Sequence, residues 1–410
     1  MTLAEAPLVL MLIGLTAYAV LGGADFGAAF WQLGARGGAH SEARREHAYR
    51  AMGPVWEANH VWLIFVLAIC WTTYPEAFAS IFSTLAVPLF VAAVGIILRG
   101  TAYAVHAGTA REIERQAIDV VFSVSSILTP FALGTAIGGI ASGRVPVGNA
   151  EGDLMTSWVN PTSFTIGVVA VATGAYLAAV YLAGDAARAG RDDLATAFRT
   201  RALAAGAVTG GVALAALLVV ALDAEKLGSR LRGWPAILAV VGSAAAGLAT
   251  IELVRRSRFE AARYLASAAV AAIVVGWGLA QRPELLPGVT VEEAAAERPT
   301  LIATITGVAL GAVIVVPSLA LLFGLVLRGR FDREAAGPGV EPRVRRVAVR
   351  GGPLVGLAIL ALAVGLPLTL LADGGPAQTV GVVALLAFVA FGSVALGSGA
   401  AAVAARDEDG

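Results

Sequence analysis

Long apolar stretches separated by short polar segments run along almost the whole chain. Each stretch has about 20 residues or more, which is enough for one helix to cross a hydrocarbon core of about 30 Å. This pattern predicts eleven membrane-spanning helices, over residues 7–33, 54–73, 77–105, 116–141, 161–184, 200–222, 235–254, 260–280, 300–328, 353–372 and 379–404. Strands are not expected, because an open sheet edge in lipid leaves backbone groups without hydrogen bonds.

The polar segments divide the chain into three parts. Residues 1–330 hold the first nine spans and form a membrane domain. Residues 331–352 are rich in Arg, Gly and Pro and form a cytoplasmic linker, and residues 353–410 form an extension with a transmembrane hairpin. The polar segment 41–50 is expected to be a cytoplasmic helix along the membrane surface. Prolines inside three spans are expected to kink them, namely Pro88, Pro130 and Pro317.

The composition supports the same class. Of the 410 residues, 58% are hydrophobic and 14% are charged, whereas a soluble domain has about 25% charged residues. The fold class is therefore an all-α, polytopic helical bundle in a membrane. Cys70, the single cysteine, excludes an intrachain disulfide and a cysteine-rich metal cluster. The loops lack the clustered basic and aromatic residues of a nucleic-acid surface. No cleavable signal peptide is expected, because the first apolar run is too long and continues into Asp25.

Basic residues are distributed unequally between the two sets of loops. Of the 29 Lys and Arg residues, 22 fall in the odd-numbered loops, in the span ends beside them or in the C-terminal tail, six fall in the even-numbered loops, and Arg99 lies deeper within a span. Cytoplasmic loops carry an excess of Lys and Arg, so the N-terminus is expected outside and the C-terminus in the cytoplasm. A missed span would upset this alternation, so the charge pattern also supports the predicted number of spans.

Ionisable and polar side chains lie within the first three spans. Asp25 lies late in the first, Glu57, Asn59 and His60 lie near the start of the second, and Arg99 lies near the end of the third. A charge at the bilayer centre costs about 2.5–3.5 kcal/mol on insertion scales, so these residues are functional candidates. By helix rise they share the cytoplasmic half, and we interpret them as a polar cluster that takes up a cation or a proton. The alternative is an ion pair that only holds three helices in register, with His60 as a packing residue.

Other catalytic signatures are missing from the sequence. It contains no P-loop, GxSxG or HExxH motif. The four histidines and four methionines give no convincing pair of axial heme ligands. We therefore expect this chain alone to bind no heme and no metal.

Three segments of the first three spans carry a recognisable pattern: GGADFGAAF at 22–30, GPVWEANHVWL at 53–63 and PLFVAAVGIILRGTAYAV at 88–105. In this order they resemble the D-G-F-D-x-G, P-x-W-D-G-N-x-V-W-L and L-x-L-R-G/P elements of subunit II of cytochrome bd-type quinol oxidases. One element alone would be a weak signal, whereas the three together are specific. The resemblance covers about residues 20–106, and the nine-helix layout extends it to about residue 330.

The resemblance implies a heterodimeric terminal oxidase in a bacterial cell membrane. The partner would be a heme-bearing subunit I with hemes b and d, and the complex would oxidise quinol and reduce O2 to water in the respiratory chain. This chain would be a scaffold and part of a cytoplasmic proton-entry pathway, with Asp25 and Glu57 as proton carriers. Arg99 would be their charge partner, and Asn59 and His60 would supply hydrogen-bonding steps. A structural quinone, membrane lipid and a small accessory subunit are further candidate ligands and partners.

The sequence departs from the family pattern at three positions of these elements. Gly22 stands in place of the first Asp, Glu57 in place of the Asp of the second element, and Ala58 in place of the Gly that follows. Glu keeps the charge but is longer by one methylene, which changes the geometry of any proton path. Residues 331–410 also extend beyond the usual end of the family, and their hairpin either covers the partner, replaces a small accessory subunit or faces lipid.

Two other functions stay open. A proton-coupled secondary transporter would use the same buried charges, but its substrate site is often marked by paired broken helices in two halves of the chain. We find no such matched pair. A purely structural membrane subunit would tolerate neutral amides in place of Asp25 and Glu57.

Overall fold

The computed structural model describes most of the chain and divides it into two units. The described residues are 2–34, 41–52, 56–106, 112–327, 353–371, 376–377, 379–381, 383–388 and 391. One unit comprises residues 1–334 and the other residues 335–410. Each unit is described by itself.

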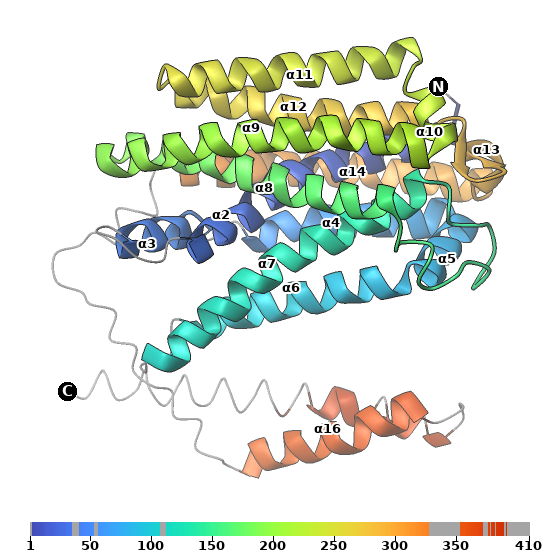
Figure 1. The fold of residues 1–410 in the computed structure, drawn as a ribbon. Coiled ribbons are helices and arrows are strands. Elements are labelled where there is room, and N and C mark those ends of the chain that lie inside the picture. Colours follow the sequence, from blue (N-terminus) through green and yellow to red (C-terminus); the bar gives the residue numbers. More distant parts are fainter. Residues whose placement is uncertain are drawn as a thin grey trace. The chain divides into compact units, whose positions relative to one another are not determined.

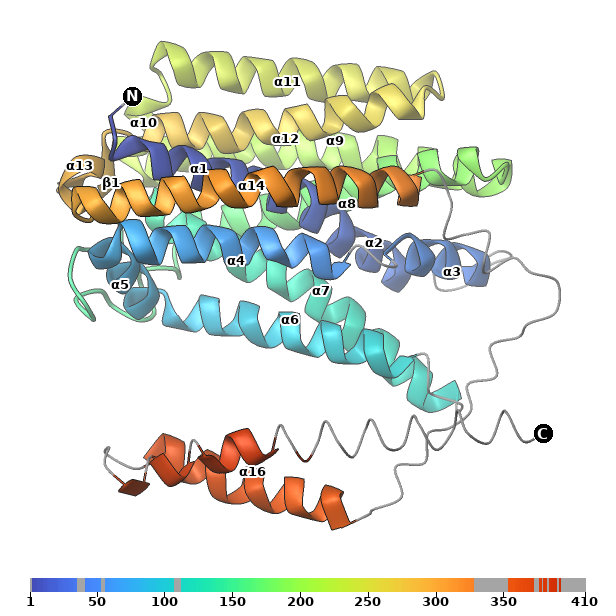
Figure 2. The ribbon, with the colours of Figure 1, turned by 180° about the vertical axis from the view of Figure 1, so that it is seen from behind.

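The first unit is a bundle of antiparallel helices (Figures 1 and 2). The first long helix is interrupted by a π-helix, η1 (Tyr18–Gly22). This π-helix separates α1 (Glu5–Ala17) from α2 (Gly23–Gly34). The helices are α1 (Glu5–Ala17), α2 (Gly23–Gly34), α3 (Ser41–Met52), α4 (Trp56–Thr73), α5 (Pro75–Thr84), α6 (Ala86–His106), α7 (Glu112–Ala141), α8 (Pro161–Arg188), α9 (Asp192–Asp223), α10 (Glu225–Arg230), α11 (Trp234–Arg255), α12 (Phe259–Gln281), α13 (Val291–Ala294) and α14 (Arg298–Leu327).

The bundle has two ends that differ in chemistry. We call the end with α3 and the turns at residues 189–191 and 256–258 the basic end, because many arginines gather there. The opposite end, with α5, α10 and α13, is the hairpin end (Figure 1). Helix α9 and its neighbours each run from one end of the bundle to the other, and successive helices alternate in direction.

Within the described part of the chain, eight helices have the length and composition needed to cross a membrane. The predicted second span corresponds to α4, whose described apolar part, Asn59–Thr73, is shorter than these eight. The polar segment 41–50 is helical, as predicted, because it forms α3. An all-α, polytopic bundle is therefore correct, while the total of eleven spans and their orientation stay predictions.

The predicted third span, 77–105, is wrong as a single helix. Leu85 separates α5 from α6, and its backbone (φ −100°, ψ 26°) is not helical. Pro88 explains the break, because proline has no N–H to donate to the carbonyl of Thr84 four residues earlier. Pro88 therefore lies in the first turn of α6 rather than at a kink in a longer helix.

The other two prolines remain inside continuous helices. Pro130 lies within α7 and Pro317 within α14. Membrane helices tolerate such prolines because neighbouring groups satisfy the freed carbonyl.

The loop at residues 282–297 contains strands that the sequence did not predict. β1 (Glu284–Leu286) and β2 (Val289–Thr290) form a two-stranded antiparallel hairpin with Gly288 at a positive φ of 82° in its turn. The argument against strands applies to sheet edges in lipid, whereas this hairpin lies at the end of the bundle (Figure 2).

The second unit contains α16 (Pro353–Leu371) and a further helical stretch within residues 379–388. The two pack closely, since a Cβ on Gly365 would lie 2.9 Å from the backbone nitrogen of Leu385. A hairpin was predicted here, but the remainder of 379–404 and the linker 331–352 lie outside the described residues.

Small residues allow the helices of the first unit to touch backbone to backbone. A Cβ on Gly27 of α2 would lie 1.9 Å from the carbonyl oxygen of Gly174 on α8, and one on Gly174 would lie 2.7 Å from that of Gly23. Helices in lipid associate largely through such close packing at small residues. This contact fixes α2, the helix that carries Asp25, against the centre of the bundle.

Gly27→Ala is expected to destabilise the protein, because no flexible side chain can move away from the added methyl group. Overpacking of this kind lowers the free energy of unfolding by about 1–3 kcal/mol or more. Gly242→Ala on α11 is the control, since a Cβ there meets no atom within 4 Å. Thermal unfolding in detergent should show a lower Tm for Gly27→Ala alone, and equal Tm values for both variants would contradict this account of the packing.

Candidate functional site

A buried ion pair joins three helices of the first unit. Arg99 of α6 donates from Nη1 to Asp25 Oδ2 at 2.8 Å and from Nη2 to Asp25 Oδ1 at 2.6 Å. Both side chains are almost fully buried, at 2% and 4% exposure. A bidentate arginine–carboxylate pair has the strongest geometry available to two such groups. The two predicted charges therefore meet.

The surroundings of the guanidinium are polar on one edge and aromatic on its faces. Arg99 Nε donates to Ser126 Oγ of α7 at 2.9 Å, and Ser126 in turn donates to the carbonyl of Phe122 at 2.6 Å. The guanidinium carbon lies 4.8 Å from the ring centre of Phe26 and 5.1 Å from that of Phe122. Cation–π contacts and the hydrogen bond to Ser126 partly replace the water that a buried charge loses.

The π-helix η1 directly precedes the helix of Asp25. A π-bulge adds a residue to a turn, and such bulges are frequent at functional sites. Asn59 of α4 contacts this bulge, because its Nδ2 donates to the carbonyl of Leu21 at 3.4 Å. The Oδ1 atom of Asn59 is buried and has no hydrogen-bond partner in the described part of the chain. Asn59 thus lies at the junction of η1 and α4 with an unused acceptor.

His60 lies among the aromatic side chains of the first helix. Its ring centre is 6.0 Å from that of Tyr18 and 5.9 Å from that of Phe26, both in edge-to-face geometry. Phe26 also covers Arg99, so His60 is one aromatic ring away from the ion pair. The structure brings together Asp25, Arg99, Asn59 and His60 near η1.

Glu57 belongs to α4, two residues before Asn59, but its side chain lies outside the described residues. Its contact with the cluster therefore stays a prediction.

Helix α3 lies at the basic end and is tied to the bundle. Arg45 forms an ion pair with Asp119 of α7. Tyr49 stacks on Tyr103 of α6 with ring centres 5.4 Å apart. Burial raises the pKa of Tyr49 to about 12, and the nearby Tyr103 hydroxyl and acidic groups add to this shift. The Tyr49 hydroxyl therefore stays neutral at physiological pH. His47 Nε2 lies 3.0 Å from the carbonyl oxygen of Leu182 on α8.

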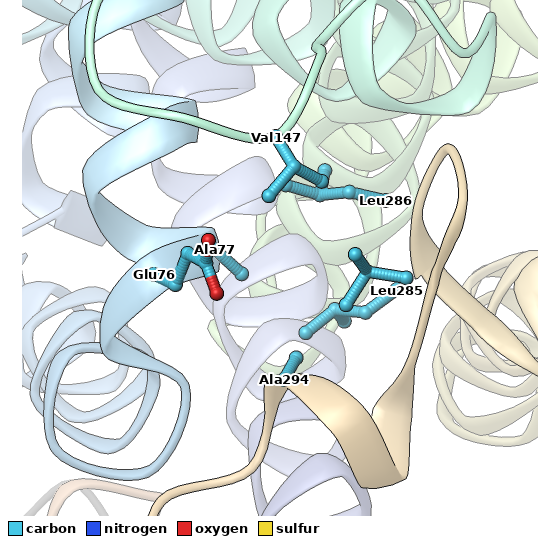
Figure 3. A pocket seen from close by; sticks show the side chains of 7 residues that line it. Glu76, Ala77, Val147, Leu285, Leu286 and Ala294 are labelled. Atoms are coloured by element: carbon cyan, nitrogen blue, oxygen red, sulfur yellow. The ribbon is translucent and has the colours of Figure 1, made fainter.

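Two hollows lie at the hairpin end, among the described residues. Figure 3 shows the smaller one, between α5 and the hairpin, which is lined by Val147, Leu286, Ala77 and the carboxylate-bearing Glu76. A second, polar cavity of about 200 Å³ is lined by charged groups that include Lys226, Arg230 and Glu284. A structural quinone on this chain stays a prediction.

The two described histidines within α3 and α4 contact other parts of the bundle. His47 faces a backbone carbonyl, and His60 is enclosed by Tyr18 and Phe26. No group of three or more His, Cys, Asp or Glu side chains within the described residues could hold a metal ion.

Sequence reasoning missed several members of the site. Ser126 and Phe122 are ordinary residues of an apolar span, and only the approach of α7 to α6 places them against Arg99. Tyr18 was also missed, although its spacing of seven residues from Asp25 puts both on one face of a helix. That spacing was the one available signal.

Comparison with known proteins gives one family. Residues 3–326 match the family model for cytochrome bd terminal oxidase subunit II. A stretch of 114 residues is 27% identical to the cytochrome bd ubiquinol oxidase subunit 2 of Bacillus subtilis (strain 168), covering 28% of this chain and 33% of that protein. The aligned region is thus about a third of that relative. The solved structure of bd oxidase from Geobacillus thermodenitrificans superimposes with a TM-score of 0.66 and 24% identity, covering 80% of this chain and 99% of the other, which shows a shared fold.

Arg99→Met is expected to destabilise the protein strongly, because it leaves the Asp25 carboxylate buried without its partner. Breaking one side of a buried ion pair typically costs about 3–5 kcal/mol. The double variant Asp25→Asn/Arg99→Met removes both charges and should recover part of this loss. Tm values in detergent test the cycle, and a single variant as stable as the parent would show that the ion pair contributes nothing to folding.

Proposed function

The chain belongs to the family of cytochrome bd terminal oxidase subunit II, and from this premise we propose that it serves in a quinol oxidase complex as scaffold and as part of a proton-entry pathway. In that complex quinol is oxidised and O2 is reduced to water. The partner is a heme-bearing subunit I that carries hemes b and d, and the two form a heterodimer in a bacterial cell membrane. The match over most of the chain carries this proposal, and it favours the oxidase over a transporter.

The proposed orientation places the basic end in the cytoplasm. The basic end collects the arginines that the charge rule assigns to the cytoplasm, including those of α3 and of the turns at 189–191 and 256–258. Asp25 lies nine residues before the end of α2, which is about 14 Å along a helix. Its carboxylate is therefore within the cytoplasmic half, where protons for O2 reduction enter.

The proposed roles follow from the charges of the cluster. Asp25 and Glu57 are the proton carriers, and Arg99 is the charge partner of Asp25, which it contacts through two hydrogen bonds. Asn59, with an unused acceptor oxygen, and His60, beside the aromatic rings of the first helix, supply hydrogen-bonding steps. The Asp25–Arg99 pair is the observation on this chain that supports a path here.

The C-terminal unit lies beyond the residues that match the family. The match ends at residue 326, whereas α16 begins at Pro353. We propose that residues 353–410 add a membrane hairpin to the family fold, after a cytoplasmic linker at 331–352.

Purification of the tagged chain from native membranes in mild detergent tests the complex. The expected result is co-elution of a heme-bearing membrane protein, seen in reduced-minus-oxidised heme spectra, together with quinol-dependent O2 uptake. A chain that elutes pure and heme-free would overturn the oxidase proposal and favour the transporter.

Asp25→Asn and Glu57→Gln in the purified complex test the proton path. Each is expected to slow quinol-dependent O2 uptake by about 100-fold, the lower range for loss of a proton-transferring group. Glu252→Gln is the matched control, because this carboxylate on α11 is exposed and pairs with Arg255 and Arg256. Heme content per complex shows whether assembly is intact, and unchanged turnover in both carboxylate variants would support a purely structural subunit.

A further inference from the structure

Tyr18 is a buried residue for which neither the fold nor the proposed proton path accounts. It is the first residue of η1 and is 6% exposed. Its hydroxyl is enclosed and has no hydrogen-bond partner within the described part of the chain. Burying a hydroxyl without a partner costs free energy that phenylalanine would not incur. An unsatisfied buried polar group in a native protein calls for an explanation, such as a bound water or a role in catalysis.

The position of Tyr18 gives that explanation. Its ring rests on Gly22, where a Cβ would lie 3.1 Å from two ring carbons. The same ring meets Phe26 edge to face at 6.4 Å and His60 at 6.0 Å. The charges of both Asp25 and Arg99 act on the Tyr18 hydroxyl. Tyr18 therefore occupies the space beside Gly22, close to both members of the ion pair.

Asn59 provides a second unsatisfied atom at the same bulge. Its amide nitrogen donates to the carbonyl of Leu21, within η1, which leaves Oδ1 buried without a partner in the residues described here. A phenol can donate and accept, and a carboxamide oxygen accepts. Water is the ligand that satisfies both types of group, and buried water commonly serves this purpose in proteins.

We propose that the Tyr18 hydroxyl is a proton-relay group, which acts with water held at the bulge between η1 and α4. The proposal rests on the proton path proposed above and extends it by one residue. In each transfer the phenol oxygen accepts a proton from a water on one side and releases its own proton to an acceptor on the other. The phenol is neutral before and after, so no charge remains in the apolar interior.

Tyr18→Phe in the whole oxidase complex tests this relay. The Tm and heme content should stay unchanged or rise, because the variant removes only a hydroxyl without a partner. Quinol-dependent O2 uptake should fall by about tenfold, below the full range for general acid–base groups because water can partly bypass a relay. The solvent isotope effect on turnover, measured in H2O and D2O, should increase, since proton delivery then limits the rate.

Tyr176→Phe is the matched control. Tyr176 of α8 is also a buried tyrosine, but its hydroxyl lies beside the Thr250 side chain and its ring faces Gly206 of α9, away from the ion pair. This variant should keep the parental turnover and isotope effect. A slower rate confined to Tyr18→Phe, with a larger isotope effect, is the result that supports the relay.

The outcomes separate this inference from the proposed function. If Asp25→Asn slows turnover while Tyr18→Phe keeps the parental rate and isotope effect, the relay is wrong and the proton path stands. If Tyr18→Phe loses activity together with heme content and Tm, the residue is structural and the relay is also wrong. Parental rates in Asp25→Asn and Glu57→Gln would overturn the path itself, and the relay with it.

Discussion

The architecture of the first unit depends on a charge pair that cannot remain unpaired in its surroundings. Asp25 and Arg99 come from α2 and α6, and Ser126 of α7 completes the hydrogen bonding of the guanidinium. In an apolar interior either charge alone would be costly, so the three helices must meet in one register. Close contact between Gly27 and Gly174 then fixes α2 against α8. The ion pair and the glycine contact together define where the polar cluster lies.

Near this pair, the Tyr18 hydroxyl and the Asn59 Oδ1 atom are buried without a hydrogen-bond partner among the residues that the structure describes. The π-helix η1 changes the register of the first helix just before Asp25 and turns the Leu21 carbonyl toward Asn59. Tyr18 begins the same bulge. Stability alone would favour apolar side chains at such positions, since unsatisfied groups in low dielectric are costly. The Tyr18 hydroxyl and the Asn59 oxygen both lie at η1, and this is the basis of the relay that we propose there.

The two ends of the bundle are organised by different interactions. At the basic end, ion pairs such as Arg45–Asp119 and Arg263–Asp185 tie α3 and the helix ends together. At the hairpin end, a short antiparallel hairpin closes the loop before α14, and Arg230 contacts Glu284 on it. The ion pairs of both ends thus lie at the helix ends and connecting loops of the first unit. The second unit, with α16, follows the residues that match the family.

The sequence alone determined the class of the protein, its family and the identity of its main charges. Runs of apolar residues predict helices because lipid requires every backbone group to bond within its own segment, and the elements around Asp25, Glu57 and Arg99 indicate subunit II. Only the tertiary structure decided which groups meet. It paired Arg99 with Asp25, brought Ser126 to the guanidinium and placed Tyr18 over Gly22. It also showed the break at Leu85 and the π-helix. Hydropathy predicts neither, because each depends on single missing or shifted backbone hydrogen bonds.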